Sequence, residues 1–292
     1  MSLFPHRTAG CRVETRYGKT VMQLNCLDAA LRQAELGPSQ YWRRHPSSRE
    51  TGKPYWHGTE TFEQAIELGR YGWKEGRENL LRAKISLKDL AEGHISLRSE
   101  DRDVYGCRPD VPLYCAGAPE HMVVPGDRFG PSAPLVDLVV QLNVTGQTDS
   151  DEMTNYGSAL ATLIDATEAE QRRVRVTLAY GMAAREFKLD VLVRVKDHNE
   201  ALDIDRLAFC LANPAMFRRV IFSFIEQGCS KEWFHAWGPG YGHPVTFECA
   251  QSEIFVPSLE HWRGKRDWST PEAAFETMKT ALVKELEGGD DE

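Results

Sequence analysis

The chain has 292 residues, of which 41% are hydrophobic and 27% are charged. This length and composition indicate a globular protein of one large domain or two modest ones, long enough to bury a sizeable core. The formal net charge of −8 argues against a general nucleic-acid coat, because phosphate binding depends on Lys and Arg, but it leaves a local basic patch open.

Sequence features also indicate a compartment. No apolar run approaches the roughly 18 residues of a membrane span, so we expect no membrane association. The first residues, Met1 to Arg7, lack the apolar stretch of a signal peptide. The seven cysteines are scattered through a long chain, which fits reduced thiols better than a disulfide framework. We therefore expect a cytoplasmic protein.

Residues 1–130 are predicted to form an N-terminal helical and irregular region. A helix is expected over residues 25–35, because apolar residues recur at helical spacing from Leu27 to Ala34. A second helix is expected to begin at Thr61, which forms a capping box with Gln64. A connecting region rich in Gly, Pro and charge follows, with short extended pieces at 111–115 and 122–124.

Residues 131–292 are predicted to form an α/β core domain with a C-terminal helix. Residues 135–142 are almost continuously apolar, which is typical of a strand covered on both faces. A polar loop and an amphipathic helix follow, and alternating polarity then predicts strands over 173–180 and 187–195. The helical crossover allows the first two strands to be parallel, whereas the short turn at 181–185 makes the last two antiparallel.

The rest of the core domain is predicted as helices, one loop and one strand. A helix over 204–211 is followed by another that Asn213 caps, with Pro214 in first position. Residues 233–244 are expected to be an aromatic, Gly-rich loop. A further strand or hairpin is expected within 245–256, and a final helix opens at Thr270.

This order of elements resembles the von Willebrand factor A domain, in which a buried strand ends in a metal-binding Asp-x-Ser-x-Ser loop and an antiparallel edge hairpin follows. The resemblance covers roughly residues 135–227 and implies a three-layer, Rossmann-like mixed sheet. The positions that match the metal loop are Asn143, Thr145 and Gln147, and only the threonine keeps the family's chemistry. Asp149 and Asp151 could substitute as oxygen ligands for Mg²⁺. The alternative is a polar loop that binds no metal, in which Asp149 or Ser150 caps the helix.

A second metal hypothesis concerns zinc. The residues Cys229, His235, His243 and Cys249 are good zinc ligands within a short span, and Cys107, Cys115 and His121 form a weaker set. Their gaps match no standard finger spacing, and a free cysteine is usually a small buried hydrophobic residue. We therefore expect no cofactor, with Mg²⁺ or Zn²⁺ as the alternatives.

Two groups of residues could contact a partner. The aromatic residues Trp233, Trp237 and Tyr241 could anchor a protein interface or stack bases, or else pack onto their own domain. A basic–aromatic group could contact a nucleic-acid backbone, or else form ordinary solvated surface; its members are Tyr41, Trp42, Arg43, Arg44, Arg49, Lys53 and Trp56.

The sequence offers no support for nucleophilic catalysis. It contains no Gly-x-Ser-x-Gly elbow, no phosphate loop that ends in Lys-Ser or Lys-Thr, and no His-Glu-x-x-His motif. We therefore lean towards a protein that is not an enzyme.

Four segments resemble an uncharacterised family associated with bacteriophages and other mobile elements: Tyr55-Trp56-His57-Gly58, Tyr71-Gly72-Trp73, Asn213 to Arg219, and Gly240-Tyr241-Gly242-His243-Pro244. The resemblance implies location in the host cytoplasm and carries no activity to particular residues. Our first hypothesis is a non-catalytic binding or assembly protein with a protein partner or self-assembly. The alternatives are a nucleic-acid-binding accessory factor for replication or transcription, and a divalent-metal-dependent enzyme or adhesion-type domain.

Overall fold

The computed structural model describes most of the chain between residues 3 and 278, and every structural statement below concerns the described residues. They comprise 3–16, 18–44, 46–78, 102–105, 108–109, 111–119, 121–123, 135–144, 148, 150–169, 172–201, 203–238, 241–245, 247, 254–256, 258, 268–270 and 272–278.

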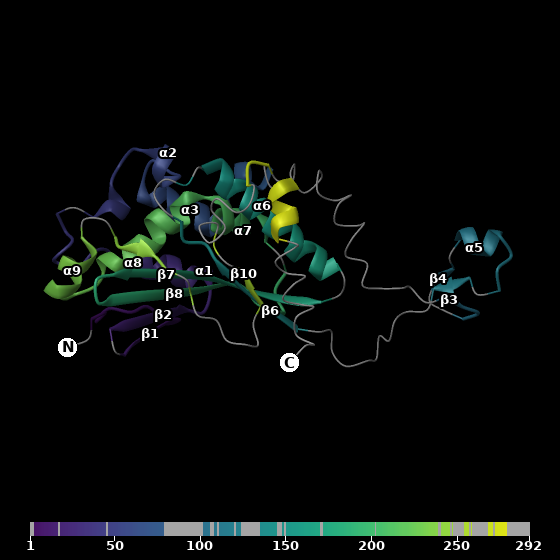
Figure 1. The fold of residues 1–292 in the computed structure, drawn as a ribbon, viewed down its shortest axis with the longest axis horizontal. Coiled ribbons are helices and arrows are strands. Elements are labelled where there is room, and N and C mark those ends of the chain that lie inside the picture. The colour runs from purple at the N-terminus through teal and green to yellow at the C-terminus, as the bar shows by residue number, and fades with distance from the viewer. Residues whose placement is uncertain are drawn as a thin grey trace.

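A seven-stranded mixed sheet is the centre of the described structure (Figure 1). Its order is β1 (Cys11–Arg16), β2 (Lys19–Leu24), β8 (Phe187–Lys196), β7 (Arg173–Ala184), β6 (Leu135–Gln141) and β10 (Ile254–Val256), and β9 (His243–Pro244) also pairs with β7. The β6/β7, β6/β10 and β2/β8 pairs are parallel, and the β1/β2, β7/β8 and β7/β9 pairs are antiparallel. The prediction of an α/β fold with a mixed sheet is therefore confirmed.

The segment from β6 to β8 has the predicted order of elements. Helix α6 (Ser150–Ala169) connects β6 to its parallel neighbour β7, and β7 turns directly into the antiparallel strand β8. The predicted turn at 181–185 is wrong in extent, because β7 continues to Ala184. The hairpin also lies inside the sheet rather than at its edge, because β2 pairs with the other side of β8.

The N-terminal region contributes two strands that the sequence analysis did not predict. Strand β2 pairs with β8 from Lys19 opposite Lys188 to Leu24 opposite Val193. The predicted domain boundary near residue 130 therefore does not coincide with a boundary of the sheet.

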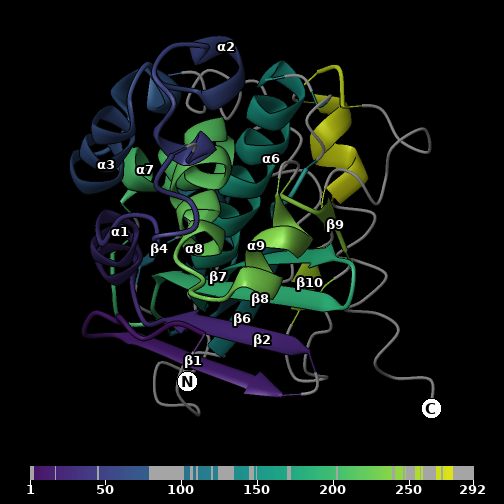
Figure 2. The same cartoon turned by 90° about the vertical axis from the view of Figure 1, so that its left-hand side faces the viewer.

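The described helices that pack on the sheet lie on one side of it (Figures 1 and 2). Helices α1 (Leu27–Glu35) and α6 contact its strands, and α3 (Phe62–Tyr71), α7 (Ile204–Ala212) and α8 (Phe222–Glu226) pack against these two helices on the same side. Residues of β7 alternate accordingly, since Val174, Val176 and Leu178 are buried while Arg175 and Thr177 are only half-buried. The described part of the chain thus contains two layers, a sheet and a helical cover on one face, and the predicted third layer stays a prediction.

We call the other side of the sheet the open face. Near the carboxyl ends of β2 and β8, its side chains are half-buried or exposed: Arg12, Glu14, Gln23, Arg175, Thr177, Leu192 and Arg194. Farther along the same face, Ala179 and Asp190 are buried. This face carries the candidate site described below.

Several helix predictions are confirmed. Helix α1 occupies most of the predicted range 25–35, and the capping box of Thr61 and Gln64 begins α3. Residues 272–278 are helical, and the hydroxyl of Thr270 accepts a hydrogen bond from the backbone N–H of Ala273 at 3.2 Å.

Helices α7 and α8 are linked through η2 (Met216–Ile221), a π-helix, and the chain then continues to α9 (Lys231–Trp237). Asn213 acts as the predicted cap, because its Oδ1 accepts a hydrogen bond from Ala215 N at 2.9 Å. Helix α9 replaces the first half of the predicted aromatic loop. Its cap is Ser230, whose hydroxyl accepts a hydrogen bond from Trp233 N at 3.0 Å.

Two short segments complete the described elements. Residues 47–57 contain η1 (Ser47–Arg49) and α2 (Pro54–His57). A separate three-stranded sheet consists of β3 (Arg102–Asp103), β5 (Met122–Val123) and β4 (Arg108–Pro109), with α5 (Val111–Cys115) between β4 and β5. Residues 111–115 are thus helical rather than extended.

Candidate functional site

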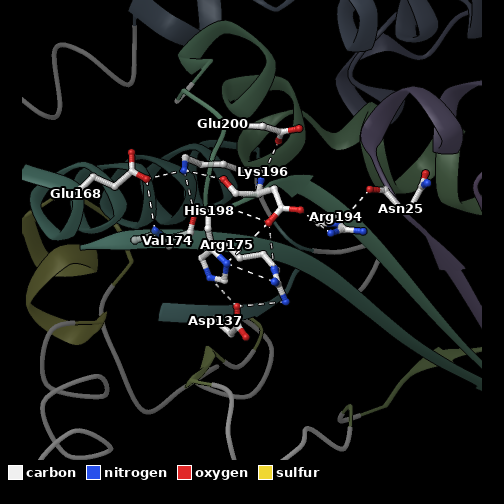
Figure 3. Close-up of polar contacts among 10 residues, drawn as sticks. Asn25, Asp137, Glu168, Val174, Arg175, Arg194, Lys196, His198 and Glu200 are labelled. Atoms are coloured by element: carbon white, nitrogen blue, oxygen red, sulfur yellow. Dashed lines mark hydrogen bonds and ion pairs between the residues drawn. The ribbon is translucent and has the colours of Figure 1, made fainter. Parts of the chain in front are cut away.

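A cluster of charged side chains lies at the end of the sheet where β2 and β8 have their carboxyl ends (Figure 3). Asp137 belongs to β6, Arg175 to β7 and Arg194 to β8, and Asp197 and His198 directly follow β8. This end of the sheet carries the amino ends of the parallel strands β6 and β7, opposite the edge at which ligands of parallel α/β sheets usually bind. The charged side chains gathered there make it a candidate ligand site on their own chemistry.

His198 contacts two residues of the cluster through its ring nitrogens. Its Nε2 lies 2.9 Å from Oδ1 of Asp137, and its Nδ1 lies 3.3 Å from Nη2 of Arg175. Because a guanidinium can only donate, Nδ1 is the acceptor of the bond from Arg175. The contact between Nε2 and Asp137 is close but lacks the geometry of a hydrogen bond.

Asp197 fixes the two arginines of the cluster. Its Oδ1 lies 3.4 Å from Nε of Arg175, and its Oδ2 lies 2.6 Å from Nη1 of Arg194. The backbone N–H of His198 donates to Oδ1 at 2.8 Å. This hydrogen bond first, and then the charges of Arg194 and Arg175, hold the pKa of Asp197 below its usual 3.8 despite partial burial. Asp197 is therefore a carboxylate at neutral pH.

Lys196 fills the buried side of the cluster. Its side chain is 3% exposed, and its Nζ lies 2.5 Å from Glu168 Oε1. The same Nζ donates to the carbonyl oxygens of Val174 at 2.9 Å and Asp197 at 3.2 Å. Three donors thus meet three acceptors, which is the condition under which a buried ammonium group is tolerated. We read Lys196 as a structural residue.

A depression on the open face, with a volume of about 560 Å³, adjoins the cluster. We call it the arginine depression. Its described lining contains three arginines, four other polar or small residues and no carboxylate: Arg12, Arg175 and Arg194 with Gln23, Asn25, Thr177 and Gly10, besides Cys11, Leu24 and Leu192. Such a lining favours an anion, because guanidinium groups bind phosphate and carboxylate through paired N–H groups.

A second depression of about 270 Å³ shares Arg194 but has a mixed charge. Lys196 and Arg206 line it together with the carboxylates Asp28, Asp197, Glu200 and Asp203. The arginine depression is therefore the better candidate for an anionic ligand.

A comparison with protein families identifies the family to which the chain belongs. The model of a family described as Domain of unknown function (DUF7192) matches residues 14–285. The chain belongs to this family. No curated protein and no solved structure matches this chain. The DUF7192 match includes every residue of the charged cluster, from Asp137 to His198.

Hydropathy gives one further finding on the DUF7192 chain. Among the described residues no single helix is long and apolar enough to cross a membrane, although α7 together with residues 216–226 passes the same test as a pair bent by 71°. Both members of this pair are core helices, since nearly all of their residues are buried.

The predicted metal loop follows β6, at the opposite end of that strand from Asp137. Asn143 is fully buried, and its Oδ1 accepts hydrogen bonds from Gln141 Nε2 at 2.7 Å and Gly181 N at 3.3 Å. This oxygen therefore joins two strands of the sheet. Asp151 is exposed in the first turn of α6, whereas Thr145, Gln147 and Asp149 lie outside the described residues.

The predicted zinc ligands are not brought together in the described structure. Within it, no group of three or more His, Cys, Asp or Glu side chains is arranged to hold a metal ion. Cys229 is half-buried, and His235 and His243 are exposed. Cys107 and Cys249 lie outside the described residues.

The aromatic members of the predicted nucleic-acid group mostly pack inward. Trp42 is 3% exposed and lies 5.2 Å from the ring of Tyr241. Trp56 is half-buried, with the guanidinium of Arg218 4.7 Å from its ring. Tyr41 is half-buried and stacks on Phe234. Self-packing therefore removes most of the aromatic surface that base stacking would need.

The basic members of that group are divided between internal contacts and solvent. Arg49 lies 4.1 Å above the Phe62 ring and donates to a carbonyl oxygen of α1 at 3.2 Å. Lys53 pairs with Glu50 at 2.6 Å. Arg43 and Arg44 are exposed. The predicted group is thus not one continuous surface.

The predicted interface aromatics are core residues. Trp233 and Trp237 are fully buried, and Tyr241 is 7% exposed. The two tryptophans lie one helical turn apart, so α9 turns both towards the core, and their ring centroids are 5.0 Å apart. These side chains are therefore not available to a partner at the surface.

Three of the four segments that carry the family resemblance meet around η2 and α8 in this DUF7192 fold, whereas Gly72 and Trp73 of the fourth lie beside Asp205 of α7. Arg219 is fully buried and donates to the carbonyl oxygens of Ser48, Glu50 and Thr59 at 2.7–3.0 Å. Gly58 has a φ of 79°, and a Cβ there would lie 2.3 Å from Asn213 Oδ1. Only glycine fits at this contact.

Glu226 closes the same network from α8. It is fully buried, and its oxygens accept hydrogen bonds from Ser48 N at 2.8 Å, Ser48 Oγ at 2.5 Å and Tyr241 Oη at 2.6 Å. Burial raises the pKa of Glu226 above its usual 4.5, although these bonds oppose the shift. We read the network around η2 as a clasp that holds residues 46–60 on the helical layer.

Proposed function

We propose that this chain is a non-catalytic binding protein that holds a phosphate group in the arginine depression. The observation that carries the proposal is that Arg12, Arg175 and Arg194 line one depression whose described lining contains no carboxylate. Asp197 lies outside that lining and orients Arg175 and Arg194. Arginines held in advance lose less conformational freedom when an anion binds.

Thermal unfolding in the presence of inorganic phosphate or pyrophosphate tests this proposal. We expect pyrophosphate to raise the Tm of the wild type, and Arg175→Gln and Arg194→Gln each to reduce the rise strongly. Arg70→Gln is the matched control, because Arg70 is an exposed arginine of α3 that pairs with Glu35 away from the depression. An equal rise in the control and in both site variants, or no rise at all, would contradict the proposal.

Nucleic-acid binding is a second candidate, and one observation favours it. The same three arginines could contact successive phosphates of a single strand, because the depression is open to solvent along the sheet. Fluorescence anisotropy with a single-stranded oligonucleotide at low salt distinguishes the two candidates. Binding that depends on Arg175 and Arg194 and exceeds pyrophosphate binding would favour the nucleic-acid factor.

We also propose the finer parts of the family resemblance. The von Willebrand A-like core is supported by the parallel β6/β7 pair joined through α6 and by the antiparallel return of β8. The degenerate state of its metal loop is supported by the structural role of Asn143. A bacteriophage or mobile-element origin rests on the four sequence segments alone, and the genes that neighbour this one would test it.

A further inference from the structure

Strand β1 is the edge of the large sheet. It pairs with β2 on one side, and no described strand pairs with its other side. Exposed edges invite pairing with another chain, and proteins usually block them with proline, a bulge or charged side chains, lysine above all. Strand β1 carries charges of both signs, which a second copy of the strand can match. The sequence of β1, Cys-Arg-Val-Glu-Thr-Arg, contains neither proline nor lysine, and its pairing with β2 is regular.

The pairing with β2 decides which backbone groups of β1 are available at the outer edge. Asn25 N donates to Gly10 O at 3.0 Å, in line with the β1/β2 register, in which Arg12 lies opposite Gln23. Because hydrogen-bonded residues alternate along an antiparallel strand, Arg12 and Glu14 also bond towards β2. The N–H and C=O groups of Val13 and Thr15 therefore point outwards.

The charges of β1 favour a second copy of the same strand. Arg12 and Glu14 are exposed on the same face, two residues apart. An antiparallel copy centred on Val13 places each Arg12 opposite the other copy's Glu14. Centring on Arg12 or on Glu14 would instead place like charges opposite each other, which destabilises a pair of strands.

We infer that two copies of this chain associate through β1, antiparallel and with Val13 on the two-fold axis, so that their sheets become continuous. The outward groups of Val13 pair with those of the partner's Val13, and Thr15 N donates to the partner's Cys11 O. Cys11 N already donates to Thr8 O at 3.1 Å, so it takes no part. A strand-to-strand contact is small, so we expect a weak dimer whose population depends on protein concentration.

Sedimentation velocity over a range of protein concentrations, without phosphate, tests the inference on the full chain. We expect the wild type to shift from monomer to dimer. Glu14→Arg should remain monomeric, because it places a second positive charge against the partner's Arg12. The double variant Arg12→Glu/Glu14→Arg should form dimers again, because it restores opposite charges. Glu67→Arg, an exposed charge reversal on α3, is the matched control and should behave as the wild type.

A further variant tests the backbone pairing itself. Thr15→Pro removes an outward N–H without removing a backbone bond to β2, but it also removes the hydroxyl that contacts Thr20 of β2 at 3.1 Å. It should remain monomeric, with circular dichroism showing that it is folded, whereas Thr15→Val, which loses only the hydroxyl, should dimerise. A wild type that stays monomeric at all concentrations, or a Glu14→Arg variant that dimerises like the wild type, would overturn the inference. The oligomeric state is measured without ligand, so this result and that of the phosphate experiment are independent.

Discussion

At the scale of single residues, the polar groups of this protein fall into two kinds. Arg175 and Arg194 are partly exposed and face a depression, whereas His57, Arg219 and Glu226 are buried around η2. The buried residues belong to the fold rather than to the candidate site. Their ionisation should therefore change the free energy of unfolding as the pH changes.

His57 gives the sharpest pH prediction. Burial, and then the charge of Arg219, lowers the pKa of His57 from 6.5 to about 4 in the folded protein. The unfolded chain therefore binds a proton below pH 6.5 that the folded chain does not. The stabilisation is complete above pH 6.5 and is lost as the pH falls towards 4, by up to about 3 kcal/mol.

Urea denaturation of the wild type and His57→Gln between pH 7.5 and 4 checks this prediction. The variant should lose that part of the pH dependence, whereas His235→Gln, which changes an exposed histidine of α9, should keep it. Identical pH profiles for the wild type and His57→Gln would show that His57 titrates normally.

Few of these residues could be predicted from the sequence. In the sequence, Asp137 interrupts the apolar run of residues 135–142. Arg175 is a polar position in the alternating strand of residues 173–180. Nothing in their spacing relates them to His198, because the three come together only through the pairing of β6, β7 and β8. The predicted Asn143 loop lies at the other end of β6.

At the scale of elements, the clasp around η2 joins segments that are far apart in the sequence. Glu226 is its central acceptor, with three donors from Ser48 and Tyr241. A π-helix is rare and usually marks a constrained site. Here, η2 accompanies two buried arginines, Arg218 and Arg219, that both bond to residues 48–59.

Replacing Glu226 should measure the strength of this clasp. Glu226→Ala leaves buried donors without an acceptor, so we expect a loss of about 3 kcal/mol or more in the free energy of unfolding. Glu226→Gln keeps an acceptor for Tyr241 and Ser48 N and should lose about 1 kcal/mol. Glu232→Ala, on the exposed side of α9, is the control for chemical denaturation. A loss in Glu226→Ala no larger than in this control would contradict the clasp.

Helices and strands with strong hydrophobic periodicity could be predicted from the sequence, whereas strands with few apolar residues could not. The capping box of α3 and the strand–helix–strand order from β6 to β8 follow from local patterns. Strands β1 and β2 escaped prediction because β1 contains few apolar residues, although Gly18, with a φ of 75°, supplies the turn between them. Helix α9 differs from the predicted loop because the glycines and Pro239 that follow it indicate a loop, whereas the Ser230 cap and buried Trp233 and Trp237 stabilise a short helix before them.

At the scale of the whole molecule, the sheet has one covered face and one open face, and the arginine depression lies on the latter. This asymmetry links the two proposals, because a dimer through β1 would place two open faces in one continuous surface. Sequence alone could not predict the asymmetry, since it depends on β2 pairing with β8 and so extending the open face beyond the core strands.

Isothermal titration of pyrophosphate into the wild type and into the double variant Arg175→Gln/Arg194→Gln decides whether the arginine depression binds phosphate. We expect saturable binding to the wild type and at least a roughly tenfold loss of affinity in the variant, since each charge-assisted hydrogen bond contributes about 1.5–3 kcal/mol. Equal affinities in the two proteins, or no heat of binding to the wild type, would contradict the proposal.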